Sequence, residues 1–235
     1  MSRLRVLVTG GGRGIGRAIA LRFAREGAFV TVAARSSDQI DDVAKEIDAA
    51  GGRGMAANMN VADYGSVEAA VWRAIEFMDG GLDVLINNAG VFDVKTFKEM
   101  RPQDWTFHLD VNLNGPFLVT LESIDYLLAS ERAHVVNIAS QGALKGFAGN
   151  TAYCASKYGL RGFSDALREE MKGQGKRPGG VRVTTVYPPN VDTGIFDGVE
   201  GEWDRSKMLA PEVIAEAVWQ AVANPVDEVI VPPKA

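Results

Sequence analysis

The sequence predicts an α/β protein built on a mostly parallel, seven-stranded sheet with helices on both faces. Three observations lead to this fold class. Short β-branched runs alternate with longer segments of helical periodicity along the 235 residues. The first of these runs leads directly into a glycine-rich turn and then a helical pattern. No repeat, low-complexity segment or linker divides the chain, so we expect residues 1–235 to form a single domain.

The predicted strands are short runs with several β-branched or other apolar residues. In chain order they are Arg5–Val8, Phe29–Ala33, Arg53–Asn58, Val84–Asn87, Ala133–Ile138, Val181–Val186 and Glu228–Val231. The predicted helices are the longer segments between them, at Gly14–Glu26, Ser37–Ala50, Tyr64–Met78, Pro102–Ser130, Ala152–Gly173 and Pro211–Ala223. Ligands of such sheets bind beyond the carboxyl ends of the strands, where the strand order reverses. We therefore expect motifs that are far apart in sequence to meet there.

The composition excludes several classes of function. Hydrophobic residues make up 46% and charged residues 23% of the chain, as in ordinary globular proteins. The formal net charge is −5 with no Lys/Arg run of five, which argues against nucleic acid or an anionic membrane as a partner. Cys154 is the one cysteine, so no internal disulfide forms, and two histidines without a second cysteine argue against a His/Cys metal site.

The N-terminal residues lack the pattern of a signal peptide, and no apolar run approaches the roughly 20 residues that cross a bilayer. We expect a cytoplasmic, soluble protein.

A glycine-rich turn, Thr9-Gly-Gly-Gly-Arg-Gly-Ile-Gly16, separates the first strand from the first helix. Glycines let the backbone approach a phosphate closely, and a helix N-terminus offers free N–H groups to it. The spacing G-x-x-x-G-x-G differs from the common dinucleotide fingerprint, and no Gly-Lys-Ser/Thr follows, which excludes a P-loop. A loop without ligand is the alternative; the position between strand and helix favours a nucleotide. The candidate contacts are Gly10, Gly12, Arg13, Gly14, Ile15 and Gly16.

The end of the second strand indicates which dinucleotide is bound. NAD sites usually carry an acidic residue about 20 positions beyond the glycine turn, on the ribose 2′-OH. Here the strand ends in Ala-Arg35-Ser-Ser37, with no carboxylate before Asp38. Arg35 and Arg13 are suited to a 2′-phosphate, although each is also a plausible solvated surface charge. The pair, with the acid missing, favours NADP over NAD.

Tyr153 and Lys157 stand four residues apart, which places them on one helical face one turn apart. A neighbouring ammonium favours the phenolate, so such a tyrosine can exchange a proton with an alkoxide or alcohol. Taken alone, the spacing also describes an ordinary solvated pair. Its context is an ordered set of further motifs: Asn87-Asn-Ala-Gly90 at a strand end, then Asn112, then Ser140 at the end of Val136-Asn-Ile-Ala-Ser140.

This set resembles the short-chain dehydrogenase/reductase family, from residue 5 to about residue 193. The resemblance implies a doubly wound Rossmann fold and four catalytic residues. Tyr153 would be the general acid/base, Lys157 would lower its pKa and hold the nicotinamide ribose, and Ser140 would bind the substrate oxygen. Asn112 would keep a helix open for a proton-relaying water. Further cofactor contacts implied are Asn60, Val61, Asn87, Ala89, Gly90, Tyr153 and Lys157.

One turn departs from the family pattern. Where the family usually has Pro-Gly after the sixth strand, this chain reads Pro188-Pro189-Asn190-Val191-Asp192-Thr193. The second proline stiffens the turn and removes a backbone N–H. Pro188, Val191 and Thr193 are carried over as contacts of the nicotinamide end. Cys154, His108 and His134 are interpreted as structural residues.

The segment near 194–209 corresponds to the family's substrate-covering region, and we expect a small mobile lid over an open pocket. Its acids, Asp197, Glu200, Glu202 and Asp204, are expected to be solvated. The glycine-rich C-terminal tail of many relatives is missing, so a homodimer through the Pro102–Ser130 and Ala152–Gly173 helices is as plausible as a homotetramer.

The sequence therefore predicts an NADP-dependent oxidoreductase that interconverts a carbonyl and a secondary alcohol, with a small-molecule substrate. One alternative is an NAD-dependent alcohol, sugar or hydroxysteroid dehydrogenase. Another is a dinucleotide-binding sensor without catalysis, which the intact catalytic set argues against. An epimerase or dehydratase is disfavoured by the short substrate region and the form of the glycine turn.

Overall fold

A seven-stranded sheet, parallel throughout, organises the computed structural model, which describes residues 3–234. The strands are β1 (Arg5–Thr9), β2 (Phe29–Ala34), β3 (Arg53–Asn58), β4 (Val84–Asn87), β5 (His134–Ile138), β6 (Arg182–Tyr187) and β7 (Glu228–Ile230). Their order across the sheet is β3-β2-β1-β4-β5-β6-β7. The sheet confirms the predicted fold class, and the observed strands agree with the predicted ones within one or two residues.

Helices connect the strands and cover both faces of the sheet. They are α1 (Gly14–Ala24), α2 (Ser37–Ala49), α3 (Tyr64–Phe77), α4 (Pro102–Leu109), α5 (Gly115–Leu128), α6 (Thr151–Glu170) and α7 (Pro211–Ala223). Shorter helical segments are the π-helix η1 (Asp110–Asn114) and the 3₁₀ helices η2 (Gln141–Ala143), η3 (Gly194–Phe196) and η4 (Arg205–Lys207). No helix within residues 3–234 combines the length and apolar character needed to cross a bilayer.

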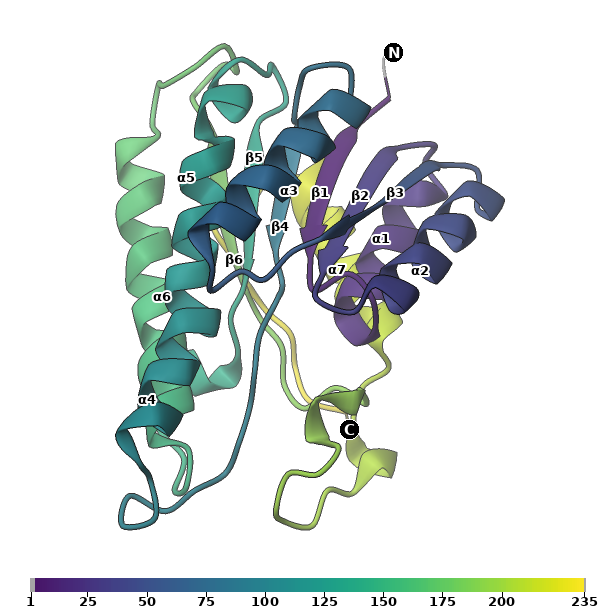
Figure 1. The fold of residues 1–235 in the computed structure, drawn as a ribbon. Helices are drawn as coiled ribbons and strands as arrows, with labels where there is room; N and C mark the ends of the chain where they lie inside the picture. Colours follow the sequence, from purple (N-terminus) through teal and green to yellow (C-terminus); the bar gives the residue numbers. More distant parts are fainter. Residues whose placement is uncertain (1–2, 235) are drawn as a thin grey trace.

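The core has two layers because successive strand residues point to opposite faces. Val6 and Val8 face the layer formed with α1, α2 and α7, whereas Leu7 faces the layer formed with α3 and α5. Val6, Leu7 and Val8 are all fully buried. Figure 1 shows the two groups of helices on opposite sides of the sheet.

The helix predicted over Pro102–Ser130 is confirmed from Pro102 to Leu128, but its middle is not a regular α-helix. The segment is α4 and α5 with the wider π-helical turn η1 between them. Buried tertiary contacts of Asn112, described below, hold this turn open. Sequence periodicity does not reveal such contacts, because they come from residues far away along the chain.

Strand order reverses between β1 and β4, so the segments that follow β1, β4, β5 and β6 open onto a common edge of the sheet. The segment expected to be a lid contains η3 and η4 and lies beyond this edge, in yellow-green near the C-terminus in Figure 1. A parallel bridge between Val191 and Leu209 closes its base. Lys234 Nζ donates a hydrogen bond of 2.7 Å to Ser206 O within it.

Candidate active site

A cavity of about 730 Å³ lies at the carboxyl edge of the sheet. Its lining joins segments that follow β1, β2, β4, β5 and β6 to the N-terminal part of α6. The predicted residues that line it are Gly10, Gly12, Arg13, Gly14, Ile15, Arg35, Asn60, Val61, Ala89, Gly90, Ser140, Tyr153, Lys157, Pro188, Val191 and Thr193. The topology therefore brings together motifs that are up to 183 residues apart, counted from Gly10 to Thr193.

The glycine turn is held in a conformation that side chains would disrupt. Gly10 and Gly14 have φ of +63° and +54°, in the left-handed region that favours glycine. A Cβ atom on Gly10 would lie 2.8 Å from Ala89 Cα. The turn is tied to the β4 segment by Thr9 Oγ1, which accepts hydrogen bonds from the N–H groups of Asn88 (3.0 Å) and Ala89 (3.1 Å). The turn and the β4 segment form one rigid wall of the cavity.

The first turn of α1 faces this cavity without a side-chain cap. Arg13 is the N-cap residue and makes no capping hydrogen bond, and the first turn contains no acidic residue. Gly14 and Ile15, at the helix start, line the cavity. Uncapped N–H groups and the positive end of the helix dipole make this terminus suited to a phosphate group.

Two predicted cofactor contacts, Gly16 and Asn87, do not line the cavity. A Cβ atom on Gly16 would lie 2.3 Å from Gly10 O, so this glycine serves the close packing of α1 beneath the turn. Asn87 is buried and donates to Thr120 Oγ1 (3.0 Å) and Asn137 Oδ1 (2.9 Å). Asn88, not chosen from the sequence, lines the cavity instead. The alternation of side chains along β4, which turns Asn87 inward, is the signal that distinguishes the two.

The charge along the lining is one-sided. Arg13, Arg35, Lys157 and Lys207 line the cavity, whereas no Asp or Glu among residues 3–234 does so. Arg35 and Ser36 lie together just beyond β2, and Ser36 is the N-cap of α2 without a capping hydrogen bond from its side chain. The position just beyond β2 therefore carries no acid, and Arg35 and Ser36 offer hydrogen-bond donors there. The cavity suits a ligand that carries several negative charges.

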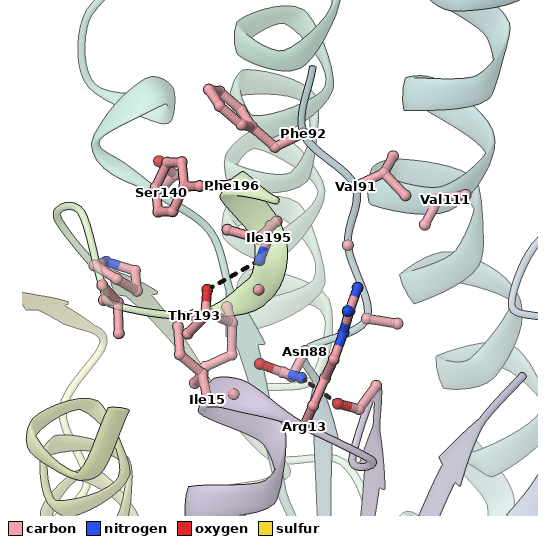
Figure 2. A pocket seen from close by; sticks show the side chains of 18 of the residues that line it. Arg13, Ile15, Asn88, Val91, Phe92, Val111, Ser140, Thr193, Ile195 and Phe196 are labelled. Carbon is pink, nitrogen blue, oxygen red and sulfur yellow. Dashed lines mark hydrogen bonds between the residues drawn. The ribbon is translucent and has the colours of Figure 1, made fainter. Parts of the chain in front are cut away.

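Ser140, Tyr153 and Lys157 meet near one end of the cavity (Figure 2 labels Ser140). Ser140 ends the β5 segment, and its Oγ accepts a hydrogen bond of 3.0 Å from Gly142 N–H. The Ser140 hydroxyl also interacts with the Tyr153 phenol, in the direction that lowers the pKa of that phenol. Lys157 follows Tyr153 by one turn of α6, and its Nζ donates to Ile138 O at 2.9 Å. Two hydroxyl groups thus converge where the oxygen of a substrate can be bound.

The pKa values of this group differ from the expectation for the tyrosine. Burial raises the pKa of Tyr153 to about 12, and the interaction with Ser140 opposes this only in part. Burial lowers the pKa of Lys157 to about 8. The ammonium lies 5.9 Å from the centroid of the Tyr153 ring and donates to a backbone carbonyl, and burial is the dominant influence on the pKa of the phenol. At neutral pH the phenol holds its proton.

Asn112 lies in the middle of η1 and is fully buried, outside the lining of the cavity. Its amide bonds to both backbone groups of Val91 and to Ser156 Oγ. Ser156 Oγ in turn donates to Tyr153 O at 2.7 Å. Asn112 therefore connects the open helical turn to the β4 segment and to the start of α6, and it acts on the site through these neighbours.

Asn60, expected beside an adenine ring, lines the cavity together with Val61. Its Oδ1 already accepts a hydrogen bond of 3.2 Å from Ala62 N–H, which uses one of its lone pairs.

An aromatic cluster beside Tyr153 was not identified from the sequence. Phe92 packs edge-on against Tyr153, with ring centroids 4.9 Å apart, and also against Phe196 and Trp203, each at 5.6 Å. Figure 2 shows Phe92 and Phe196 at the Ser140 end of the cavity, with Arg13 and Asn88 toward the other. The only sequence signal was the aromatic content of the lid segment.

The acids of the lid segment lie outside the cavity lining. Arg205 binds two acids near its base, with Nη1 2.8 Å from Asp192 Oδ1 and Nη2 2.6 Å from Asp197 Oδ1. Asp204 caps η4 by accepting from Ser206 N–H at 3.1 Å. These acids hold the shape of the segment and leave its apolar side chains to face the cavity.

The histidines and the cysteine lie outside the cavity lining. His134 is buried on β5 with Nε2 2.8 Å from Thr184 Oγ1, and burial lowers its pKa to about 3. His108 Nδ1 lies 2.7 Å from Asp104 O. Cys154 is buried and free. No cluster of three or more His, Cys, Asp or Glu suited to a metal occurs in the part of the chain that the structure describes.

Comparison with known proteins gives consistent results. Residues 5–202 match the model of the short chain dehydrogenase family. The chain is 30% identical over 232 residues to hydroxysteroid dehydrogenase-like protein 2 of Xenopus tropicalis, covering 94% of this chain and 54% of that protein. It thus spans about half the length of that relative. It is 36% identical over 229 residues to D-threitol dehydrogenase of Mycolicibacterium smegmatis, covering 92% and 84% respectively.

Among solved structures, the fold is similar to that of an alcohol dehydrogenase from Thermococcus sibiricus, crystallised with 5-hydroxy-NADP. The TM-score is 0.89 at 26% identity, with 100% of this chain and 97% of the other covered. The fold, the arrangement of the glycine turn and the Ser–Tyr–Lys group, and the family match agree. The chain belongs to the short-chain dehydrogenase/reductase family of NAD(P)-dependent oxidoreductases.

Proposed function

We propose that the protein is an NADP-dependent carbonyl reductase that converts a ketone or aldehyde into an alcohol, with Tyr153 as the proton donor. The observation that carries this proposal is that Ser140 and Tyr153 line the same cavity as the uncapped start of α1. The pair provides a place for a carbonyl oxygen, and the helix start provides one for a pyrophosphate.

The residues present fit a phosphorylated dinucleotide. Gly10 and Gly14 have the left-handed φ that lets the backbone of the turn line the cavity, and Gly12 lines it between them. Arg35 and Ser36 supply donors for a 2′-phosphate. The lining also has no carboxylate within residues 3–234 to receive a free ribose 2′-hydroxyl in the manner of NAD sites. These observations favour NADP over NAD.

The chemistry divides between cofactor and protein. The nicotinamide supplies the hydride to the carbonyl carbon. Ser140 and Tyr153 donate hydrogen bonds to the carbonyl oxygen, which polarises the carbonyl group and stabilises negative charge as it develops there. Tyr153 then gives its proton to that oxygen, completing the alcohol, and regains a proton from solvent.

The raised pKa of Tyr153 supports the reductive direction. A phenol with a pKa of about 12 is protonated at neutral pH, which is the state that a proton donor needs. Alcohol oxidation would need the phenolate instead. Lys157, with its ammonium directed into the cavity wall, is positioned to bind the ribose hydroxyls of the nicotinamide half.

We also propose that residues 194–209 form a lid over the substrate end, and that two copies associate through α4, α5 and α6. Exposed apolar side chains on these helices support the second point: Trp105, Phe117, Leu121 and Tyr158. Size-exclusion chromatography with light scattering of wild type and of Leu121→Glu tests it, since a charged side chain in such an interface would yield monomers.

The activity is tested by measuring NADPH and NADH binding and then NADPH oxidation with a panel of ketones and aldehydes. We expect tighter binding of NADPH and reduction of at least one carbonyl. Tyr153→Phe should lower kcat by about 10²- to 10⁴-fold, the range usual for general acid catalysis, with little change in NADPH affinity. Preference for NADH, or turnover only of alcohols, would contradict the proposed cofactor or direction. A Tyr153→Phe variant with full activity would exclude the phenol as the acid.

A further inference from the structure

The aromatic cluster beside Tyr153 lies where the organic group of a substrate must go. The carbonyl oxygen is fixed by Ser140 and Tyr153, and the glycine turn lies toward the cofactor end of the cavity. The remainder of a substrate therefore extends along the wall formed by Phe92, Phe196 and Trp203. We call these three side chains the aromatic wall.

The aromatic wall is continuous and contacts the catalytic phenol. Phe92, which follows β4, is its centre, packing against Tyr153 and both lid aromatics. Phe196 and Trp203 also pack against one another, with ring centroids 4.7 Å apart. Rings at these separations, edge-on around Phe92 and tilted between Phe196 and Trp203, form a stable cluster. A ligand in this part of the cavity faces carbon atoms from two segments, the one that follows β4 and the lid.

Lys207 of the lid lines the cavity, but several other polar groups of the lid are engaged by protein partners. Trp203 Nε1, the one polar atom of the wall, donates to Val199 O at 3.2 Å and is not free for a ligand. Thr193 Oγ1 accepts from Ile195 N–H at the start of η3. The Arg205 contacts with Asp192 and Asp197 hold the same segment from outside the cavity. The wall is thus held in place by hydrogen bonds and ion pairs that do not reach the substrate.

This surface discriminates between classes of carbonyl compound. Each hydroxyl of a sugar or polyol gives up hydrogen bonds to water, and an aromatic wall does not replace them. An apolar ring or chain gains by leaving water and by packing against aromatic rings. Because the aromatic wall offers no free polar partner, a hydroxyl-rich compound loses hydrogen bonds on binding against it, and the difference in kcat/KM is expected to be large.

We propose that the substrates are ketones or aldehydes carrying an apolar ring or chain next to the carbonyl, selected by Phe92, Phe196 and Trp203, rather than sugars or polyols. This rests on the proposed reductase function and deepens it. It separates the chain from the substrate that the name of its D-threitol dehydrogenase relative indicates, which is a polyol.

The test compares two ketones of different polarity with the wild-type protein and NADPH. In phenylacetone a phenyl ring is attached to a carbon adjacent to the carbonyl group. In erythrulose the carbons adjacent to the carbonyl group carry hydroxyls. We expect kcat/KM for phenylacetone to exceed that for erythrulose by about 100-fold or more. Equal values, or a preference for erythrulose, would overturn the proposal while leaving the reductase function standing.

Variants of the wall locate the cause of the preference. Trp203→Ala removes a half-buried lid ring that makes no ring contact with Tyr153, so the catalytic phenol keeps its Phe92 neighbour. We expect this change to lower kcat/KM for phenylacetone about 10-fold, mainly through KM, and to alter erythrulose reduction by less than about 2-fold. The matched control is Trp72→Ala on α3, 62% exposed and outside the cavity, which should change neither ketone.

Phe92→Leu distinguishes binding from positioning. If Phe92 selects substrates, this variant weakens phenylacetone reduction more than erythrulose reduction. Equal loss on both would show that the ring only supports Tyr153 and would overturn its part in specificity.

Binding gives a readout that does not depend on turnover. Calorimetry of the protein saturated with NADPH, which cannot oxidise an alcohol, should show 1-phenylpropan-2-ol binding at least about 10-fold more tightly than D-threitol, with the difference reduced in Trp203→Ala. If no carbonyl is reduced but this binding difference is found, the reductase function fails and the inference about the site holds. If carbonyls are reduced and the difference is missing, the inference fails and the function holds.

Discussion

The side chain of Asn112 binds both backbone groups of Val91: its Oδ1 accepts the N–H at 2.8 Å, and its Nδ2 donates to the carbonyl at 2.9 Å. The same Nδ2 donates to Ser156 Oγ at 3.0 Å. Val91 directly precedes Phe92, the centre of the aromatic wall. One fully buried amide therefore fixes the segment that carries Phe92 relative to the helix that carries Tyr153.

Replacing Asn112 by alanine should impair both stability and catalysis. Three hydrogen bonds are lost, and the buried groups of Val91 are left without this partner. We expect a loss of about 2–4 kcal/mol in the free energy of unfolding, measured by urea denaturation. The kcat should fall as well, since Tyr153 and Phe92 are no longer fixed relative to one another.

Asn114→Ala is the control. Asn114 lies in the same π-helical turn but is exposed, and within residues 3–234 its side chain donates a hydrogen bond only to Asp110 Oδ1. It should change stability by less than about 0.5 kcal/mol. Similar losses in both variants would show that Asn112 has no special part in the site.

Arg35 is expected to set the preference for NADP. Its guanidinium lines the cavity beyond β2 and is exposed, so a 2′-phosphate would pair with it in partial contact with water. Arg35→Ala should raise the Kd of NADPH about 10- to 100-fold and leave that of NADH within about 2-fold. Arg17→Ala serves as control: Arg17 lies on α1, is paired with Glu46 and does not line the cavity. Equal weakening of both cofactors by Arg35→Ala would assign the arginine to another part of the dinucleotide.

The sequence predicts the sheet well because the signal is local. Alternating β-branched runs and helical periodicity place every strand within one or two residues. Helical periodicity does not predict the π-helical turn η1 within this continuous helix, where Asn112 contacts Val91 and Ser156; only the family resemblance indicates that Asn112 keeps a helix open. These partners are 21 and 44 residues away. Local periodicity carries no information about them.

In the candidate site, too, the sequence predicts what local motifs determine and not what contacts between distant residues determine. Motif residues at strand ends line the cavity because parallel strands bring their carboxyl ends to one edge. Within the Asn87–Gly90 motif, Asn88 lines the cavity whereas Asn87 points inward to Thr120 and Asn137, and side-chain alternation along the strand is the local signal that separates the two. Phe92 could not be singled out, because its position is defined by Tyr153, Phe196 and Trp203, all distant in sequence. The pKa of Tyr153 depends on burial, which the four-residue spacing to Lys157 does not reveal.

Asp83 should stabilise the end of the sheet opposite the cavity, and its effect should depend on pH. The carboxylate is almost fully buried and accepts from Arg5 Nη2 (2.9 Å), Ser130 Oγ (2.6 Å) and Arg132 Nη2 (2.7 Å). Burial alone would raise the pKa of Asp83, but the hydrogen bonds from Arg5 and Ser130 outweigh it and hold the pKa below its usual value. The stabilisation is present above the unfolded-state pKa of about 4 and is lost as pH falls through the folded-state value.

Asp83→Asn should therefore cost about 2–4 kcal/mol between pH 5 and 8, with the difference from wild type shrinking below pH 4. Thermal or urea denaturation at several pH values measures this. Asp125→Asn, an exposed substitution on α5, should change stability by less than about 0.5 kcal/mol. A difference for Asp83→Asn that is constant from pH 3 to 8 would contradict the ionic explanation.

Lys157 should reduce the stability of the protein at neutral pH, as the cost of its place in the site. Its ammonium is almost fully buried, and burial lowers its pKa from 10.5 to about 8. Below pH 8 both the folded and unfolded chains carry the proton, and the folded chain bears the penalty of a buried charge. Between pH 8 and 10.5 the folded chain has released that proton while the unfolded chain still binds it, so the stability of the wild type rises with pH in this window.

Lys157→Met removes the charge while keeping an unbranched apolar chain. We expect a gain of about 1–3 kcal/mol in the free energy of unfolding at pH 7, where the upper value corresponds to the full pKa shift and the lost hydrogen bond to Ile138 O reduces it. The gain should shrink as pH rises from 8 to 10, and NADPH reduction activity should be largely lost. Lys172→Met, an exposed lysine paired with Glu169, is the control and should be neutral within about 0.5 kcal/mol. If Lys157→Met is less stable than wild type at pH 7, or its gain in the free energy of unfolding does not vary between pH 7 and 10, the buried ammonium does not destabilise the fold. A stabilised, inactive variant would instead show that the fold tolerates this charge because the site requires it.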